Sequence, residues 1–464
     1  MRLRRALAVA IAGLAATVGI AASVGLPAVS ARAATTSVQL PISKYSHMLV
    51  DPVHQHIFFT SGSGSGSILV TDYSGNTVAT IPNEPGATGL ALSGDGSTVY
   101  AALASGDAVS AISTSTLTET ARYATGSGTD PTYVAYTSGK IWFGYGSYGG
   151  TQIGIGSIDP SSSPAAVTLN AVPSPLTAGG WAPVLAASPN GELAAYEPEQ
   201  EPAEMATWDV SSGTATVLAP AQFLPSTGFL QSLQITPDGK DVVTSSGQVF
   251  RVSDLSADGD YSTPGPANSV SIASDGTVAV GTTGFSSSAV WMFAPGGSGS
   301  LNTYYPPSNG LELASDGAAV TPDASELFAV TVVDGSGDFP TLNIVSDPAQ
   351  VASALTVYGP ATAKHGQAIT ITGTLAGTAY GTLYGTPYAG GQTLTVTRFD
   401  PVYPNGVALP DVTTAADGSF SFTDTPPKAK VDTGTVTYQV AYAGDAHLSA
   451  STASASVTVH YNGS

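Results

Sequence analysis

The sequence of 464 residues contains no cysteine, and only 10% of its residues are charged. Without cysteine there is no disulfide framework, no thiolate metal site and no thiol-based redox motif. Basic residues are scarce, with 13 Lys and Arg against 33 Asp and Glu and a formal net charge of −20. Such a chain repels phosphate backbones, so we expect no nucleic-acid partner. The hydrophobic content of 42% is ample for sizeable cores.

The first 33 residues are typical of a secretory signal. Arg2, Arg4 and Arg5 form a positive start, an apolar stretch follows over Ala6–Leu26, and Ala31-Arg32-Ala33 fits a cleavage site. The apolar stretch is also long enough for an uncleaved membrane anchor, which is the alternative. Cleavage would leave nine basic against 33 acidic residues, because this segment holds four basic residues and no acid. We therefore expect a secreted protein, extracellular or associated with the cell wall, that is not membrane-embedded after cleavage.

A polar turn recurs along most of the chain and is the main signal of architecture. It is centred on positions 51, 95, 138, 190, 238, 275 and 323, so the spacing is 37 to 52 residues. Short apolar and β-branched runs flank each turn, and four-stranded propeller blades repeat at about 40–50 residues. Seven turns predict seven blades over residues 34–348. The last position is open, since Ser315-Asp316-Gly317 is an alternative turn.

The two ends of this region complete one sheet if the ring closes. The last repeat offers only three strands, over Ala318–Thr321, Leu327–Val333 and Thr341–Val345. The segment Thr35–Ile42 precedes the first turn and has the pattern of an outer strand. We predict that it supplies the missing fourth strand, because a closed ring protects the edges that an open sheet exposes.

The second repeat carries a family resemblance. Residues 92–101 read LSGDGSTVYA and residues 107–112 read DAVSAI. These segments resemble the YVTN-type β-propeller repeat of surface-layer-like proteins, and the resemblance covers about Thr35–Pro348. It implies a propeller fold and leaves the function open, because propellers serve in binding and in catalysis.

After a linker at residues 349–354 the pattern changes. Residues 355–464 hold β-type runs separated by Gly, Pro and Asp turns, which predicts an immunoglobulin-like sandwich. Tyr438–Asp445 and Ser454–Val459 resemble the terminal strands of bacterial Ig-like surface repeats. The expected runs are Ala368–Thr374, Gln392–Phe399, Gly418–Thr423, Thr435–Ala441 and Ala453–His460. The predicted fold class is all-β, with a seven-bladed propeller followed by this sandwich.

The funnel where the innermost strands begin is the expected binding site of a propeller. The residues that enter these strands are the ligand-binding candidates: His47, Thr88, Tyr133, Trp181, Phe229, Gln231 and Asn268. Carboxylates are few there, with Asp130 and Asp316 nearby. Aromatic rings at a funnel suit stacking on sugars or peptides, and the alternative is that they pack between blades.

Two further groups of aromatic residues have a surface-like pattern. The first joins Trp142 and Phe143 with the contact candidates Tyr145 and Tyr148 among glycines. The second is a tandem G-T-x-Y repeat with the contact candidates Tyr380, Tyr384 and Tyr388. Tyr offers rigid contact area with a polar tip, which favours an adhesive role. An inserted hairpin without a ligand is the alternative for the tandem.

Acidic clusters do not match known metal loops. Asp254, Asp258 and Asp260 lie near Gly259, but their spacing is not that of an EF-hand, so Ca²⁺ is the alternative to no cofactor. Glu197, Glu199, Glu201 and Glu204 alternate with prolines, which predicts a solvated loop between strands.

No catalytic set is evident, and the Gly-x-Ser-x-Gly motif is absent. We therefore expect a non-enzymatic, monomeric surface protein whose propeller binds a cell-wall glycan or a surface protein, with the Ig-like domain as a spacer or wall contact. One alternative is an extracellular lactonase or lyase, which needs at least three carboxylate, amide or His groups meeting at the funnel. Another is a purely structural surface protein.

Overall fold

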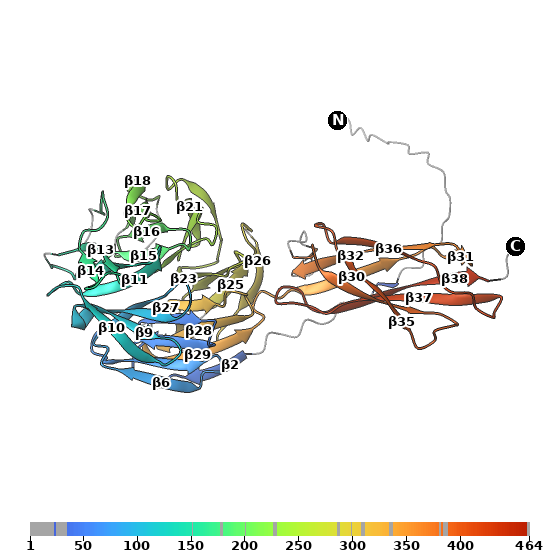
Figure 1. Cartoon of the computed structure of the whole chain (residues 1–464), viewed down its shortest axis with the longest axis horizontal. Helices are drawn as coiled ribbons and strands as arrows, with labels where there is room; N and C mark the ends of the chain where they lie inside the picture. Colours follow the sequence, from blue (N-terminus) through green and yellow to red (C-terminus); the bar gives the residue numbers. More distant parts are fainter. Residues whose placement is uncertain are drawn as a thin grey trace, which may run out of the picture. The chain divides into compact units, whose positions relative to one another are not determined.

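The computed structural model describes residues 35–461 except 151, 177–179, 200, 226–229, 285–287, 298, 308–310, 334–336, 380–381 and 384–387, together with Ser23 and Val24. The chain divides into two compact units between Gln350 and Val351. Apart from one short 3-10 turn, η1 (Ala104–Gly106), the regular structure of the described residues is β-strand (Figure 1). The all-β prediction is confirmed.

Most of the predicted export signal, residues 1–33, lies outside the described residues. Its exceptions, Ser23 and Val24, form the short strand β1. Within the described part of the chain, no helix has the length and apolar character needed to cross a bilayer.

The first unit consists of four-stranded antiparallel sheets, and the described residues form seven of them. We call them blades one to seven. Blades one to three contain β3 (His47–Asp51), β4 (His56–Thr60), β5 (Ser67–Asp72), β6 (Thr77–Pro82), β7 (Ala87–Leu92), β8 (Thr98–Leu103), β9 (Ala108–Ser113), β10 (Thr118–Ala124), β11 (Pro131–Thr137), β12 (Lys140–Tyr145), β13 (Gly154–Asp159) and β14 (Ala166–Thr168). Blades four to six contain β15 (Val184–Ala187), β16 (Glu192–Tyr196), β17 (Glu204–Asp209), β18 (Thr216–Phe223), β19 (Leu233–Ile235), β20 (Asp241–Thr244), β21 (Gln248–Arg251), β22 (Ala257–Asp260), β23 (Ala267–Ile272), β24 (Val278–Thr282), β25 (Ala289–Phe293) and β26 (Ser300–Tyr304). Blade seven contains β27 (Leu311–Val320), β28 (Glu326–Val333), β29 (Asp338–Ser346) and, from the start of the chain, β2 (Thr35–Gln39).

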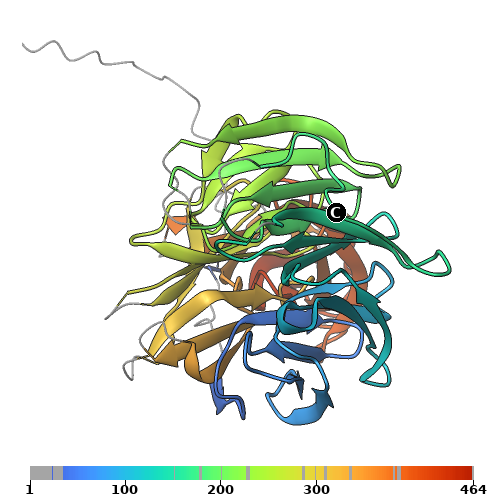
Figure 2. The same ribbon diagram turned by 90° about the vertical axis from the view of Figure 1, so that its left-hand side faces the viewer.

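The blades form a closed ring around a common centre. The first strand of each blade contacts the first strand of the next, and β27 of blade seven contacts β3 of blade one. Figure 2 shows the sheets arranged radially, with the blue N-terminal strands beside the orange strands of blade seven. Each predicted turn lies between the first and second strands of a blade. The propeller prediction is confirmed.

Closure uses the strand that the sequence predicted. Strand β2 pairs antiparallel with β29, from Thr35 opposite Val345 to Gln39 opposite Thr341. The buried Asn343 of β29 fixes this pairing, because its Oδ1 accepts a 2.7 Å hydrogen bond from Ser37 Oγ. Its Nδ2 donates to Ala329 O at 3.0 Å. The ring is thus closed by main-chain pairing and by one buried amide.

The recurring turns share a hydrogen-bond pattern that explains their sequence. In three of them an Asp Oδ1 accepts a bond of 2.7 to 2.8 Å from a hydroxyl two residues earlier. The same oxygen accepts from the main-chain N–H two residues later, at 3.0 to 3.2 Å. The three aspartates are Asp95, Asp238 and Asp323. Such side-chain acceptors stabilise tight turns between strands.

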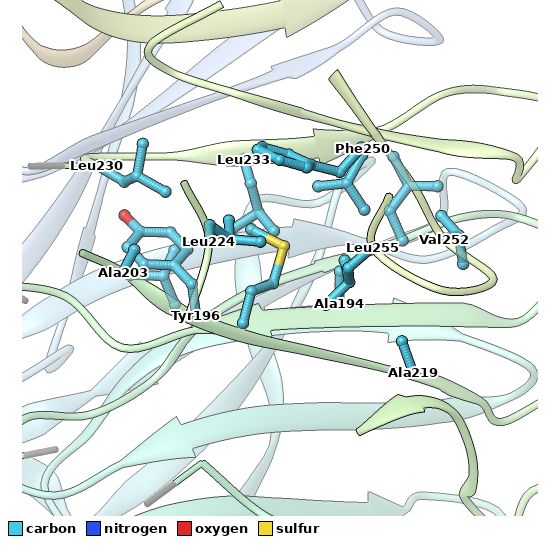
Figure 3. Packing of buried hydrophobic residues seen from close by; sticks show 14 residues of the cluster. Ala194, Tyr196, Ala203, Ala219, Leu224, Leu230, Leu233, Phe250, Val252 and Leu255 are labelled. Carbon is cyan, nitrogen blue, oxygen red and sulfur yellow. The ribbon is translucent and has the colours of Figure 1, made fainter. Parts of the chain in front are cut away.

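Hydrophobic clusters between neighbouring blades form the core. Figure 3 shows the cluster between blades four and five, in which Tyr196 and Leu224 lie near Leu233 and Phe250. The second and third strands of most blades are buried over most of their length, for example Ile57, Phe58 and Phe59 on β4. A middle strand of a blade is covered on both faces by its neighbours, so its apolar residues do not alternate with polar ones.

Each junction between blades also carries a hydrogen bond from an uncharged polar side chain to the main chain of its neighbour. Five of the side chains donate to a carbonyl oxygen through a hydroxyl and one through an amide, while Gln234 accepts from Ile272 N. Around the ring the pairs are Thr60–Thr88, Thr88–Thr132, Thr137–Ser188, Thr207–Val252, Gln234–Ile272, Asn268–Leu313 and Tyr45–Asp316. Bonds of this kind contribute roughly 0.5–1.5 kcal/mol each.

The second unit consists of two five-stranded sheets. The first contains β1, β30 (Ala352–Tyr358), β32 (Ile369–Ala379), β33 (Thr382–Leu383) and β36 (Ser419–Asp424). The second contains β31 (Thr362–Lys364), β38 (Ser451–His460), β37 (Thr433–Tyr442), β34 (Thr393–Phe399) and β35 (Val407–Thr413). Buried apolar side chains from both sheets, such as Ile371 and Val457, face one another across Gly359.

The sequence predicted five of the strands in this unit. It missed three other strands that are longer than two residues, namely β30, β31 and β35. Strand β30 begins at Ala352, inside the predicted linker of residues 349–354, so the junction is shorter than expected. β31 and β35 are mostly exposed, and their polar or Pro-containing sequences lack the alternation that marks a half-buried strand.

Buried Glu84 makes the stability of the first unit depend on pH. Ser110 Oγ donates to Glu84 Oε1 at 3.2 Å and Arg122 Nη2 lies 3.9 Å away, while Oε2 has no hydrogen-bond partner. Burial, and to a lesser degree Glu119, raise the pKa of Glu84 to about 7. The folded state therefore holds a proton that the unfolded state releases near pH 4.5. The stabilisation is complete below that pH and is lost as the pH rises through 7.

We predict that Glu84→Gln stabilises the protein at pH 8 by on the order of 2 kcal/mol and has little effect at pH 4. The amide keeps an acceptor for Ser110 and carries no charge to bury. Urea denaturation of the first unit at both pH values measures the effect. Exposed Glu199→Gln is the matched control, and an equal response of the two variants at pH 8 would contradict the role of Glu84.

Candidate functional site

The first strands of the blades surround a central channel of about 400 Å³. We call the side on which these strands begin the mouth face. Antiparallel pairing also places on this face the loop between the second and third strands of each blade and the end of its fourth strand. The channel is lined mainly by apolar side chains and main chain, and its described lining contains no Lys, Arg or Glu. Its polar side chains include His47, Gln231, Gln234 and Asp316.

A pair of one imidazole and one carboxylate lies in the channel where blade seven meets blade one. His47 Nδ1 is 2.7 Å from Asp316 Oδ2, and both side chains are about three-quarters buried. Asp316 occupies an irregularity in β27, where the register with β28 shifts between Leu313 and Ala318, and its φ is 50°. The sequence left Ser315-Asp316-Gly317 open as a turn; it is a bulge in the innermost strand. Bulges of this kind redirect a side chain, here toward His47.

The pair has limited chemistry by itself. An imidazole held by a carboxylate suits proton transfer or the binding of a hydroxyl or amine. Tyr45 OH donates to the main-chain oxygen of Asp316 at 2.7 Å, and this hydrogen bond stabilises the bulge. Among the described residues, no third carboxylate, amide or imidazole is hydrogen-bonded to either side chain. The enzyme alternative needs at least three such groups at the funnel, and the channel lining holds the amides of Gln231 and Gln234 besides this pair.

Two other predicted ligand-binding residues line the channel. Burial raises the pKa of Tyr133 to about 12, with smaller contributions from Asp316 and Glu199, so its hydroxyl stays protonated and can donate. Gln231 also lines the channel, and its main-chain N–H donates to Ser245 Oγ at 2.9 Å. The structure thus places His47, Tyr133 and Gln231 around one space, and their binding role stays a prediction.

Two predicted residues form junctions between blades and are absent from the channel lining. Thr88 Oγ1 donates to Thr132 O of the next blade at 2.7 Å. Asn268, which is 7% exposed, donates through Nδ2 to Leu313 O at 3.0 Å. Their side chains are committed to the ring. Neither side chain lines the channel, and their role in ligand binding stays a prediction.

Trp181 lies away from the channel and forms an exposed aromatic pair with Tyr148. The two ring centroids are 5.4 Å apart with an interplanar angle of 29°. Tyr148 is 74% and Trp181 42% exposed, and they come from the mouth-face loops β12–β13 and β14–β15. The sequence assigned them to separate groups, because a spacing of 33 residues gives no sign of contact.

A buried carboxylate supports this pair. Glu197 is 2% exposed and accepts a 3.1 Å hydrogen bond from Trp181 N, and also one from Gly180 N. Burial raises its pKa, and these two main-chain bonds oppose the rise. The prediction of a solvated loop is therefore wrong for Glu197 and for Glu204, which is 3% exposed. Glutamates beside prolines look solvated in sequence, and nothing in that pattern shows that main-chain donors pair with one of them.

The prediction that Trp142, Phe143 and Tyr145 lie at the surface with Tyr148 is wrong. Tyr145, Trp142 and Phe143 are each at most 1% exposed, because β12 is a middle strand covered by neighbouring blades. Tyr145 OH donates to Asn170 Oδ1 at 2.9 Å, which satisfies the buried hydroxyl. Tyr145 is thus a core residue and not a contact residue.

Three predicted contact or binding residues, Phe229, Tyr380 and Tyr384, lie outside the described residues. Tyr388 is described, and its ring stacks on His447 with centroids 4.1 Å apart. Its role in contacts stays a prediction.

The mouth face collects the exposed aromatic residues of the first unit. All five such residues among those described lie on mouth-face loops or at strand ends on that side: Tyr148, Trp181, Phe223, Tyr305 and Phe339. The opposite side exposes large aliphatic residues instead, such as Val53 and Leu218. Sequence reasoning missed Phe223, Tyr305 and Phe339; the position of each at a strand end on this face would have revealed them.

The acidic residues considered for Ca²⁺ have partners within the chain. Asp258 pairs with Arg251 at 2.9 Å, and Asp254 accepts from Ser256. Asp258 and Asp260 do line a second cavity of about 510 Å³ on the opposite side, between blades five and six. Within the described residues, no group of three or more His, Cys, Asp or Glu side chains is arranged to hold a metal ion.

Comparisons with known proteins show a similarity of fold only. No protein-family model and no curated protein matches the sequence. Among solved structures, the chain is similar to the β-propeller domain of Cps50 (Swd1) from Myceliophteria thermophila, with a TM-score of 0.50 and 11% identity over 67% of this chain and 99% of that one. It is also similar to hydrazine synthase from Kuenenia stuttgartiensis, with a TM-score of 0.49 and 13% identity over 67% of this chain and 97% of that one. At these identities the first likeness shows the fold alone.

We predict that Thr88→Val destabilises the first unit by about 1–2 kcal/mol, because it removes the bond to Thr132 O and leaves that oxygen without its donor. Val keeps the β-branched shape, so strand propensity and volume change little. Thr118→Val, on an exposed outer strand, is the matched control and is expected to change stability by less than about 0.5 kcal/mol. Thermal and urea denaturation measure both. Equal stability of the two variants would contradict the junction role.

Proposed function

We propose that this chain is a secreted, non-enzymatic binding protein that recognises a glycan or a surface protein with its mouth face. The segregation of exposed aromatic residues carries this proposal. All five described examples in the first unit lie on one side of the ring, and exposed aromatic groups gathered on one side mark a binding surface.

The channel supports recognition on the same side. Its volume of about 400 Å³ falls in the range of ligand sites, and it combines apolar walls with a few polar groups. The His47–Asp316 pair and the Tyr133 hydroxyl would orient a bound hydroxyl, amine or amide at the centre. The five exposed aromatic residues of the mouth face, which we call the rim aromatics, would supply contact area around it.

The remaining parts fit a surface protein. We infer that the propeller is of the YVTN type, from the resemblance at residues 92–112, and that the second unit is immunoglobulin-like. Its two five-stranded sheets support the latter, with β30, β32 and β36 in one and β34, β37 and β38 in the other. In this proposal the second unit is a spacer or a wall contact, and the protein acts as a monomer outside the cell.

The pair His47–Asp316 favours one second candidate, a hydrolase or lyase of the propeller type. Its position on a bulge in the innermost strand is the specific observation. A turnover screen with lactones and polysaccharides separates the candidates, because a binding protein leaves every substrate unchanged.

We predict that replacing the five rim aromatics with Ser lowers affinity for cell-wall polymers or surface proteins by at least tenfold. The reason is the loss of most of the aromatic contact area on the mouth face, and exposed aromatic side chains dominate such interfaces. A binding array of wall polysaccharides and surface proteins is the measurement. A variant with Val53, Val217 and Leu218 replaced by Ser, on the opposite side, is the control. Equal binding by the two variants would contradict the proposal.

A further inference from the structure

We propose that Tyr148 and Trp181 form a subsite for an uncharged sugar ring. This inference rests on the proposed function and names its ligand class and its location. The rings are stacked 5.4 Å apart, and each leaves a large part of its surface to solvent. The flat C–H face of a pyranose packs on an exposed aromatic ring in the way that other apolar groups do.

The pair is held in place before any ligand binds. Glu197, which is 98% buried, accepts main-chain N–H bonds from Gly180 and Trp181 and so fixes the loop that carries the indole. Gly180 lies against Tyr148, since a Cβ added there would be 3.2 Å from Tyr148 Cδ2. Burying a carboxylate costs free energy of desolvation. A solvent-exposed loop without a function would gain nothing from a buried carboxylate that positions its tryptophan. Preorganised aromatic side chains lose little entropy on binding.

A small cavity is lined in part by the two loops that carry the pair. It has a volume of about 210 Å³, and its lining includes Ile153, Leu176 and Pro183 from these two loops and Glu197 from the β16–β17 loop. This is below the roughly 300–1,000 Å³ of sites that enclose a whole ligand. A substituent of a sugar, such as a hydroxymethyl or an acetamido group, fits that scale, while the ring itself would lie on the aromatic pair.

The charges around the pair decide the class of glycan. No Lys or Arg occurs between Lys140 and Lys240, so blades three and four offer an anion no cation on the mouth face. The β16–β17 loop, which also carries Glu197, contributes the exposed Glu199 and Glu201, whose carboxylates accept hydrogen bonds and repel other anions. Sugar hydroxyls are donors and suit these acceptors. Uronic acids, sulfated sugars and phosphate-bearing polymers do not.

Tryptophan fluorescence reports directly on this subsite. The chain has four Trp; Trp142 and Trp208 are at most 1% exposed and Trp291 is half-buried, so Trp181 is the exposed one. We titrate the full chain with cellohexaose, chitohexaose and mannohexaose, and with polygalacturonate as the anionic probe. The expected result is a change of Trp emission with at least one uncharged hexasaccharide and none with polygalacturonate. Binding of that hexasaccharide should be nearly unchanged between 50 and 500 mM NaCl, because no charges pair.

Variants locate the binding. Tyr148→Ala and Trp181→Ala should each weaken hexasaccharide binding at least tenfold by calorimetry. Trp181→Phe should bind within about threefold of the parent while the emission change disappears, which separates loss of the ring from loss of the fold. Val53→Ala on the opposite side is the control and should bind as the parent does.

The outcomes distinguish this inference from the proposed function. If a hexasaccharide binds and the five-residue rim variant loses it, but Tyr148→Ala and Trp181→Ala do not, the subsite is wrong and the mouth-face proposal stands. If only polygalacturonate binds, or if the array finds only a basic peptide or protein whose binding weakens with salt, the assignment to uncharged sugars is overturned. If the opposite-side variant loses binding and the rim variant keeps it, both proposals fail.

Discussion

The ring depends on hydrogen bonds that uncharged polar side chains make across every junction between blades. Apolar packing between neighbouring sheets supplies most of the stabilisation but is not directional, so alone it leaves the angle and register between blades loosely defined. A bond such as Thr137 Oγ1 to Ser188 O, 2.8 Å long and buried, fixes where one innermost strand lies against the next. Seven such links complete a circuit, and the pairing of β2 with β29 closes it.

This constraint accounts for the composition. A charged side chain buried between blades would cost several kcal/mol in desolvation, whereas a hydroxyl or amide needs one partner to be satisfied. Thr, Asn, Gln and Tyr therefore provide the polar side chains of the seven junction bonds, and charge is confined to 10% of the sequence. Glu84 shows the cost of an exception: burial moves its pKa to about 7, and one of its oxygens has no partner.

The architecture was predictable where it has a local signal, and the site was not. Turn chemistry repeats with the blade, so each first-to-second strand turn and the closing strand were found in advance. The surroundings of a side chain depend on contacts between blades, which periodicity does not reveal. Thr88 and Asn268 enter innermost strands as expected, yet their polar groups face the next blade. Tyr145 lies among glycines, which suggests a surface loop, but it is the last residue of a strand that is covered on both faces. The bulge that turns Asp316 toward His47 looks like an ordinary turn in sequence.

This difference between local signals and long-range contacts explains why only some of the rim aromatics were predicted from the sequence. Strand direction alone decides which face a loop occupies, so residues far apart in sequence meet there when an even number of strands separates them. Two strands, β13 and β14, lie between Tyr148 and Trp181. Their loops thus emerge on one side, and Glu197, one strand pair further on, reaches the same side to hold the indole. The outer junction of blades three and four can carry a binding surface because the inner hydrogen-bond circuit already fixes those blades. Its loops are then free to take the shape that Glu197 gives them through the main-chain N–H groups of Gly180 and Trp181.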